Sequence, residues 1–180
     1  MIERLYSDFD PDITIRSKLA KTFSENEIDF QSIRNTEGVS NVSRAVEEVV
    51  VLKHEKKWVN AHLIGVDTNF LSIAHMADHT VYGESKLTKG ILPLGICGVG
   101  LLDNLNAYSV QNNGYDQLVL YSPKRNISMR FGSNLFHTNI LNITAGVNFN
   151  KEVNTDKLIV PITFAREALD YDDDITALYV

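Results

Sequence analysis

Residues 90–102 have the sequence GILPLGICGVGLL, and we expect the fold to be organised around this uncharged stretch. It contains the only cysteine, Cys97, and four of the ten glycines. A run this long without charge normally lies inside a fold, because exposing it leaves a large apolar area in water. It is too short and too rich in glycine to cross a bilayer, and its glycines indicate tight turns or close backbone approaches. We therefore expect the stretch to be buried and Cys97 to be chemically inert.

The length and composition are those of an ordinary globular chain. One hundred and eighty residues suit one domain with a core that needs no disulfide or metal. The net charge of −6 disfavours nucleic acid as a partner, because phosphate binding needs a basic face. A single cysteine cannot form an internal disulfide and suggests a reducing compartment. The acidic start, MIERLYSDFDPD, lacks the apolar core of a secretion signal, so we expect no secretion by that route.

The pattern of apolar residues favours strands. Residues 45–53 are rich in β-branched side chains, a polar turn follows at 55–57, and residues 58–66 are expected to pair back as a hairpin. We expect a short helix ending at Arg34, another over residues 101–110, and further strands over residues 70–74, 117–121, 127–131, 139–144, 147–149 and 158–165. Pro161 cannot donate a backbone hydrogen bond, which predicts an edge strand or a bulge. The expected fold is α+β and β-rich: an antiparallel sheet, as a sandwich or partial barrel, with one or two helices and an extended N-terminal arm.

The first 16 residues are expected to form that arm, and residues 17–180 a single β-rich domain. Three aspartates and Pro11 oppose a regular helix in the arm, while its aromatic rings have little local core to bury them. We expect the arm to bind a neighbouring protein through Leu5, Tyr6, Asp8, Phe9, Asp10 and Asp12.

The segment Gly95-Ile96-Cys97-Gly98 resembles the nucleophile motif of chymotrypsin-like cysteine proteases of the picornaviral type. In such a site Cys97 would be the nucleophile, activated by His75 or His62. His75 lies only 22 residues before Cys97, however, and the Gly-x-His element expected after the nucleophile is missing. The protease is therefore kept as the alternative, and we expect no enzymatic activity.

Four histidines, His54, His62, His75 and His79, form the other group that could carry chemistry. On a helix, His75 and His79 would share one face, as a metal pair does, with Asp78 as a third ligand. Met76 occupies the place of the glutamate that a zinc hydrolase needs after its first histidine. We therefore predict neither a metal nor another cofactor.

Two runs near the N-terminus, LYSDFDP at residues 5–11 and IDFQSIRN at 28–35, resemble the lysozyme-like baseplate wedge subunit of contractile phage tails. The resemblance covers about a fifth of the chain and implies a structural subunit of a virus-like particle, in a phage tail, baseplate or neck. The implied partners are other virion structural proteins in a symmetric assembly of several copies, with no nucleic acid and no membrane. The implied location is the virion, after assembly in the host cytoplasm.

Overall fold

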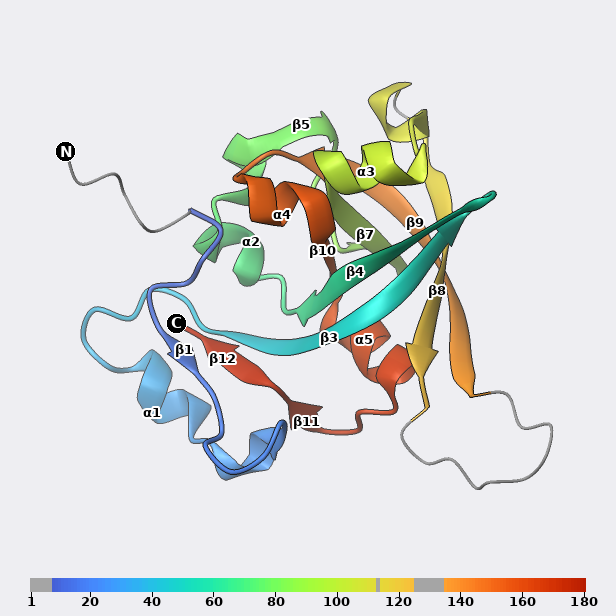
Figure 1. Ribbon diagram of the computed structural model, residues 1–180. Coiled ribbons are helices and arrows are strands. Elements are labelled where there is room, and N and C mark those ends of the chain that lie inside the picture. Colours follow the sequence, from blue (N-terminus) through green and yellow to red (C-terminus); the bar gives the residue numbers. More distant parts are fainter. Residues whose placement is uncertain (1–7, 113, 125–134) are drawn as a thin grey trace.

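The computed structural model describes residues 8–112, 114–124 and 135–180. Within them, six strands pair in a closed ring, in the order β3–β4–β10–β7–β9–β8 and back to β3 (Figure 1). The ring strands are β3 (Ser43–His54), β4 (Lys57–Val66), β7 (Leu92–Gly98), β8 (Asp116–Pro123), β9 (Phe136–Val147) and β10 (Lys157–Pro161). The ring closes because β8 pairs with both β9 and β3. The predicted β-rich α+β class with a partial barrel is therefore confirmed.

The barrel mixes antiparallel and parallel pairs. β3 and β4 form an antiparallel hairpin, which confirms the strands and the turn expected between residues 45 and 66. β10 runs parallel to β4 but antiparallel to β7, and β7 runs parallel to β9. The parallel pairs join segments that are distant in sequence, so the barrel depends on long-range contacts.

Short strands extend the barrel at its margins. β12 pairs with the start of β3 and β1 with β12, while β5 pairs with the end of β9 and β6 with the start of β7. β2 and β11 form a separate ladder. Their bounds are β1 (Thr14–Ile15), β2 (Phe23–Ser24), β5 (Thr80–Gly83), β6 (Thr88–Lys89), β11 (Asp174–Ile175) and β12 (Ala177–Tyr179).

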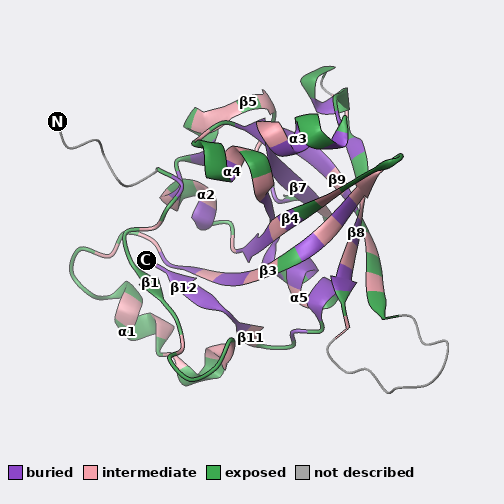
Figure 2. Cartoon of the chain, in the orientation of Figure 1, coloured by how far each residue is buried: buried purple, intermediate pink, exposed green. Residues whose placement is uncertain are grey.

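Two helices cover the opposite ends of the barrel (Figure 1). α3 (Val99–Leu105) follows β7, and α5 (Ile162–Leu169) follows β10. Because β7 and β10 are antiparallel neighbours, helices that follow them leave at opposite ends. The barrel interior holds one apolar cluster, to which α3 contributes Leu101 and α5 contributes Phe164. Figure 2 shows this burial along the barrel strands.

A second apolar cluster lies on the outside of the barrel wall. It joins Ile64, Ile96 and Ile159 of three adjacent strands with side chains from the segments that cover them. The covering helices are α2 (Phe70–Ile73), the 3-10 turn η2 (Met76–His79) and α4 (Lys151–Asp156). Gly98 allows α4 to pack directly on the backbone, since a Cβ there would lie 2.3 Å from the carbonyl oxygen of Val153.

The expectation for residues 90–102 is correct only in part. Residues 94–98, which include Cys97, are buried, and so are Leu101 and Leu102. Gly90 and Ile91 form an exposed turn, in which Ile91 is 98% exposed, and Leu92 at the start of β7 is exposed as well. The lack of charge therefore predicted the buried part of β7, but it did not predict where the buried residues begin.

The strand expected over residues 70–74 is wrong, because Phe70–Ile73 is the helix α2. The backbone N–H groups of Phe70 and Leu71 donate to the carbonyls of Asp67 and Thr68, so the turn after β4 winds into a helix. Phe70 and Ala74 are buried while Ser72 between them is exposed, whereas in a strand these three residues would share one face.

The edge strand expected over residues 158–165 is also wrong. β10 ends at Pro161 and lies in the middle of the sheet, between β4 and β7. Pro161 is the last residue of the strand and the N-cap of α5, where a missing backbone N–H costs little. Gly65 of β4 makes room for this helix, since a Cβ there would lie 2.2 Å from the Cβ of Ala165. The strand expected over residues 127–131 lies outside the described residues, and β8 pairs with β9 and β3.

The described part of the expected N-terminal arm, residues 8–16, is attached to the domain. β1 pairs with β12, and Ile13 and Val180 exchange two backbone hydrogen bonds. Phe9 is only 5% exposed and lies edge-to-face against Phe70 and Phe149, at centroid distances of 5.4 and 5.2 Å. Its ring thus belongs to the second apolar cluster of its own chain.

We expect Phe9→Ala to lower the free energy of unfolding by about 3–5 kcal/mol, because a buried ring would leave a cavity between two aromatic neighbours. Thermal and urea unfolding measure the effect. Leu19→Ala is the matched control, since Leu19 is 99% exposed and should change stability by no more than about 0.5 kcal/mol. Equal stability of the two variants would show that Phe9 is not part of the core.

Candidate functional site

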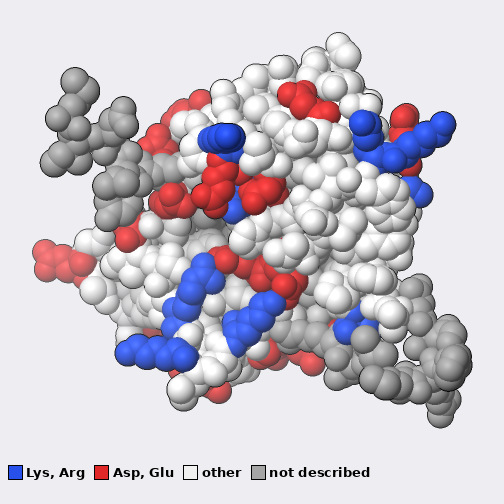
Figure 3. Space-filling model, viewed as in Figure 1, with Lys and Arg blue, Asp and Glu red and all other residues white. Residues whose placement is uncertain are grey.

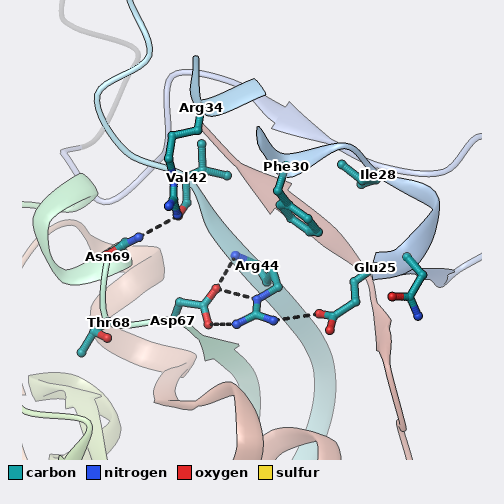
Figure 4. Close-up of a pocket in the computed structure, with 10 residues that line it drawn as sticks. Glu25, Ile28, Phe30, Arg34, Val42, Arg44, Asp67, Thr68 and Asn69 are labelled. Carbon is teal, nitrogen blue, oxygen red and sulfur yellow. Dashed lines mark hydrogen bonds and ion pairs between the residues drawn. The ribbon is translucent and has the colours of Figure 1, made fainter. Parts of the chain in front are cut away.

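A cleft of about 550 Å³ lies between the N-terminal helical segment and the barrel (Figure 4). We call it the Arg44 cleft. The helical segment contributes the 3-10 turn η1 (Glu25–Glu27) and the helix α1 (Phe30–Arg34), and the barrel contributes the start of β3 and the turn after β4. The lining residues are Glu25, Asn26, Ile28, Phe30, Arg34, Val42, Arg44, Asp67, Thr68 and Asn69.

Local capping holds the helical side of the cleft in place. The Ser24 hydroxyl accepts a hydrogen bond from the backbone N–H of Asn26 and caps η1. The Asp29 carboxylate accepts from the backbone N–H and the hydroxyl of Ser32 and caps α1. These bonds satisfy backbone donors that a helix start leaves open. The helix expected to end at Arg34 is confirmed, and it is five residues long.

The floor of the cleft is an ion-pair network centred on Arg44. The Asp67 carboxylate accepts from Nε and Nη2 of Arg44 at 2.9 and 2.8 Å, and from its backbone N–H. Glu25 accepts from Nη1 of Arg44 at 2.9 Å and from Nη2 of Arg166, in α5, at 2.7 Å. The network thus ties together η1, the start of β3, the turn after β4 and α5.

The network fixes the charge of its members. The hydrogen bond with Asp67 is the largest cause that raises the pKa of Arg44. Burial opposes the ionisation of Glu25, but its bonds with Arg166 and Arg44 outweigh burial and lower its pKa. Because all three guanidinium nitrogens of Arg44 already face carboxylates, the floor does not offer a free cation to an anionic ligand. The cleft presents a fixed polar floor beside the apolar side chains of Ile28 and Phe30, which suits a peptide segment.

A smaller pocket of about 210 Å³ lies on the outside of β4 and β10, and we call it the Lys157 pocket. Lys157 is only 8% exposed, and its ammonium donates to Nδ1 of His62 at 3.2 Å and to Glu152 at 3.0 Å. Burial lowers the pKa of His62, and the positive charge of Lys157 lowers it further. His62 is therefore a neutral acceptor here, with Nδ1 unprotonated.

The N-terminal segment closes the other side of the Lys157 pocket. Arg16 donates to Glu47 at 2.6 Å, and Glu47 also accepts a hydrogen bond from the Tyr179 hydroxyl. Burial raises the pKa of Tyr179, and the neighbouring Glu47 raises it further. The phenol therefore stays protonated and remains a donor.

The structure separates the residues of the alternative protease. Cys97 is fully buried in the interior cluster, and burial raises the pKa of its thiol. His62 points to the outside of the barrel wall, while His75 is exposed in the connection between α2 and η2. A buried, protonated thiol is a poor nucleophile. Neither histidine shares the environment of Cys97.

The four histidines considered for metal binding also lie apart. His54 contacts the Leu105 carbonyl at the α3 end, His62 contacts Lys157, and His79 stacks on Phe149. His75 has a left-handed backbone (φ 46°) and separates α2 from η2, so His75 and His79 do not share a helix face. Among the described residues, no group of three His, Cys, Asp or Glu side chains could hold a metal ion.

The six residues expected to bind a partner have different environments. Leu5 and Tyr6 lie outside the described residues, and Phe9 is in the core. The Asp8 carboxylate forms a hydrogen bond with Nε2 of His79 at 3.2 Å. Asp10 lines the Lys157 pocket and Asp12 is exposed. A role of these residues in partner binding stays a prediction.

Sequence reasoning missed both polar centres, although each left a signal. The hairpin register pairs Ala45 with Val66, which brings the flanking Arg44 and Asp67 together. Opposite charges on the two residues that flank a predicted hairpin could have indicated this ion pair. Lys157 directly precedes the apolar run 158–161, but only the pairing of β10 with β4 places it opposite His62.

No protein-family model matches the sequence, and no curated protein is similar to it in sequence. The fold is similar to that of the extracellular domain of a noncanonic ABC-type transporter, YknZ, from Gram-positive bacteria. The two share 11% identity over 92% of this chain and 81% of that domain, with a TM-score of 0.54. It is also similar to the periplasmic region of MacB from Actinobacillus actinomycetemcomitans. Here the identity is 9% over 91% of this chain and 66% of that region, with a TM-score of 0.56.

These likenesses overturn the resemblance to the phage baseplate wedge subunit, which rested on two short runs of residues. The role as a virion subunit, the virion proteins as partners and the location in a virion are wrong as well. The expectation that no membrane is involved belongs to the same error, since both similar structures lie on the outer side of a membrane. Among the described residues, no helix is long and apolar enough to cross a membrane.

We expect Arg44→Gln to lower the free energy of unfolding by roughly 1–3 kcal/mol, because Asp67 and Glu25 would keep their charge and lose a partner. The expected loss is moderate because the Arg44 side chain is still 35% exposed. Urea unfolding measures it, with Arg34→Gln at the exposed rim of the same cleft as control. A loss below about 0.5 kcal/mol for both variants would mean that the network does not stabilise the cleft.

We also expect His62 to make stability depend on pH. Its pKa is lowered in the folded state, so the unfolded chain binds the proton first. The contribution of His62 is complete above its ordinary pKa of about 6.5 and is lost as the pH falls toward the folded pKa. When the pH falls from about 7 to 5, the melting temperature of His62→Gln should therefore fall less than that of the wild-type protein.

The control for this measurement is His75→Gln, because His75 is exposed and lies outside the Lys157 pocket. This variant should keep the wild-type dependence on pH. The same pH dependence in wild type and His62→Gln would mean that the Lys157–His62 contact does not govern the titration.

Proposed function

We propose that this chain is an extracytoplasmic contact domain of a membrane transporter of the MacB and YknZ type. The observation that carries the proposal is the likeness in fold to extracytoplasmic regions of two such proteins, over more than nine tenths of this chain. One of these regions is described as part of an ABC-type transporter. The proposed work of the domain is to hold a partner segment on the outer side of the membrane.

The Arg44 cleft is the proposed contact site. Its polar floor is held rigid by charge-assisted hydrogen bonds, so a bound segment would not have to order it. Ile28 and Phe30 are half-buried and offer apolar area at one wall, and Arg34 offers an exposed cation at the rim. An extended peptide with an apolar side chain and a nearby carboxylate fits these three features.

We further propose that the domain acts without catalysing a reaction. The one thiol that sequence reasoning considered as a nucleophile lies in the barrel interior, away from solvent. The carboxylates of Glu25 and Asp67 pair with the guanidinium groups of Arg44 and Arg166, so they hold the shape of the cleft and are poorly placed for proton transfer.

Cysteine substitution tests both the side of the membrane and the contact site. The native Cys97 is buried and should stay unlabelled, so Asn26→Cys in the cleft and Asn104→Cys on α3 each supply one reactive thiol. In intact cells that encode the protein, a membrane-impermeant maleimide with a photocrosslinker should label both variants. On illumination, Asn26→Cys should crosslink to a membrane protein more strongly than Asn104→Cys, because α3 covers the other end of the barrel.

The two readouts separate the two parts of the proposal. Labelling of Asn104→Cys and Asn26→Cys only after cell lysis would contradict an extracytoplasmic domain. Labelling of intact cells with equal crosslinking of both variants would place the domain outside but reject the Arg44 cleft as its contact site.

A further inference from the structure

The hairpin of β3 and β4 ends in a cationic turn on an otherwise acidic chain. Residues 53–58, KHEKKW, contain three lysines and one glutamate, whereas the whole chain carries a net charge of −6. Lys56 and Lys57 are exposed. Figure 3 shows the basic side chains gathered at this end of the hairpin, with one acidic side chain among them. We call residues 53–58 the hairpin tip.

Aromatic and aliphatic side chains adjoin the lysines on the outer surface of the barrel. Trp58 is 54% exposed, and the Lys53 ammonium lies 5.0 Å from its ring centroid. Trp58 also packs against Tyr121 of β8, with the ring centroids 5.1 Å apart. Val119 and Ile140 pair with one another on the next strands and extend this surface.

The side of the barrel wall that α2 and α4 cover is buried, whereas the surface beside the hairpin tip is uncovered. Val49 and Ile140 on this uncovered surface are more than half exposed. Strand alternation explains why both side chains face outward, because every second residue of β3, β8 and β9 points away from the barrel interior. The result is an apolar and aromatic surface bordered by lysines at one end.

We propose that the hairpin tip binds the surface of a membrane that contains anionic phospholipids. Trp and Tyr favour the membrane–water interface, where the ring is partly buried and the polar atom stays hydrated. Lysines near an anionic leaflet each strengthen binding, and the attraction is confined to about one Debye length. The hairpin tip places both kinds of side chain at one projecting end of an acidic protein.

Two other occupants fit the same surface less well. In a symmetric dimer through this patch, the lysines of one copy would approach those of the other, and like charges oppose association. Protein interfaces are depleted in lysine at their centres. Lysine ammonium groups are flexible and lack the planar, bidentate geometry of an arginine guanidinium. They therefore suit a fluid layer of lipid phosphates better than one rigid carboxylate partner.

This inference goes beyond the proposed function, because it concerns the end of β3 away from the Arg44 cleft. Lys53 follows Arg44 by nine residue steps along β3, which is about 30 Å of extended strand. With the hairpin tip on a membrane, the cleft would therefore lie about 30 Å along the strand from the lipid headgroups.

Tryptophan fluorescence tests the proposal directly, since Trp58 is the only tryptophan in the chain. The purified full chain is titrated with vesicles of phosphatidylcholine, with and without phosphatidylglycerol. We expect a blue shift of Trp58 emission and co-sedimentation with the anionic vesicles, loss of both at high salt, and neither with neutral vesicles.

Charge variants test whether the hairpin tip is responsible. Lys56→Gln with Lys57→Gln should lower the partition coefficient about 30-fold, which is the effect of two lysines at an anionic surface. The matched control is Lys18→Gln with Lys151→Gln, because these lysines are exposed elsewhere and the net charge changes equally. The control should bind within about twofold of wild type.

Three outcomes would overturn the proposal. The first is no emission shift and no co-sedimentation with anionic vesicles. The second is equal weakening by the tip and control variants, which would reflect net charge only. The third is an emission shift with polyglutamate but not with vesicles, which would identify an acidic polypeptide as the occupant. Because the assay uses purified protein and lipid, its failure would leave the extracytoplasmic location to be decided by the labelling experiment.

Discussion

The insertion of β10 between β4 and β7 is the constraint on which the rest of the structure depends. All five residues of this strand are buried, because one face joins the barrel interior and the other joins the outer cluster. Leu158 and Val160 point inward, and Ile159 points outward. Apart from Lys157 at its start, the strand is apolar, as expected of a strand that is buried on both faces. Without β10 the ring of strands could not close.

The same strand positions both polar centres. At its start, the parallel register sets Lys157 opposite His62, which builds the Lys157 pocket. At its end, Pro161 begins α5, and Arg166 of that helix reaches Glu25 in the Arg44 cleft. A shift of β10 by one residue would turn each side chain to the other face and break both contacts. The cleft and the pocket are therefore coupled through one rigid element.

Structure formed between residues that are close in the sequence could be predicted well. The hairpin of β3 and β4 could be predicted because its strands are adjacent and its turn is polar, whereas the β10–β4 pair joins residues 62 and 157 and leaves no local trace. Pro161 indicated an edge strand or a bulge because residues 158–164 alternate as a strand does, although proline is also common at the start of a helix. The cysteine count suggested a reducing compartment, yet a lone thiol buried in the barrel cannot form a disulfide in either compartment. Phe9 was assigned to a partner because its core neighbours, Phe70 and Phe149, are distant in sequence.

The aromatic contacts of Phe9 have a mechanical meaning. Phe70 touches Phe9 near one end of the described chain and Tyr179 near the other, with centroid distances of 5.4 Å in both cases. Both ends are therefore anchored at one aromatic cluster, beside the β1–β12 pair. Tension applied at either end of the described chain would therefore load this cluster and the β12–β3 ladder before it reached the rest of the barrel. The hairpin tip, at the far end of β3, would then keep its shape under such a load.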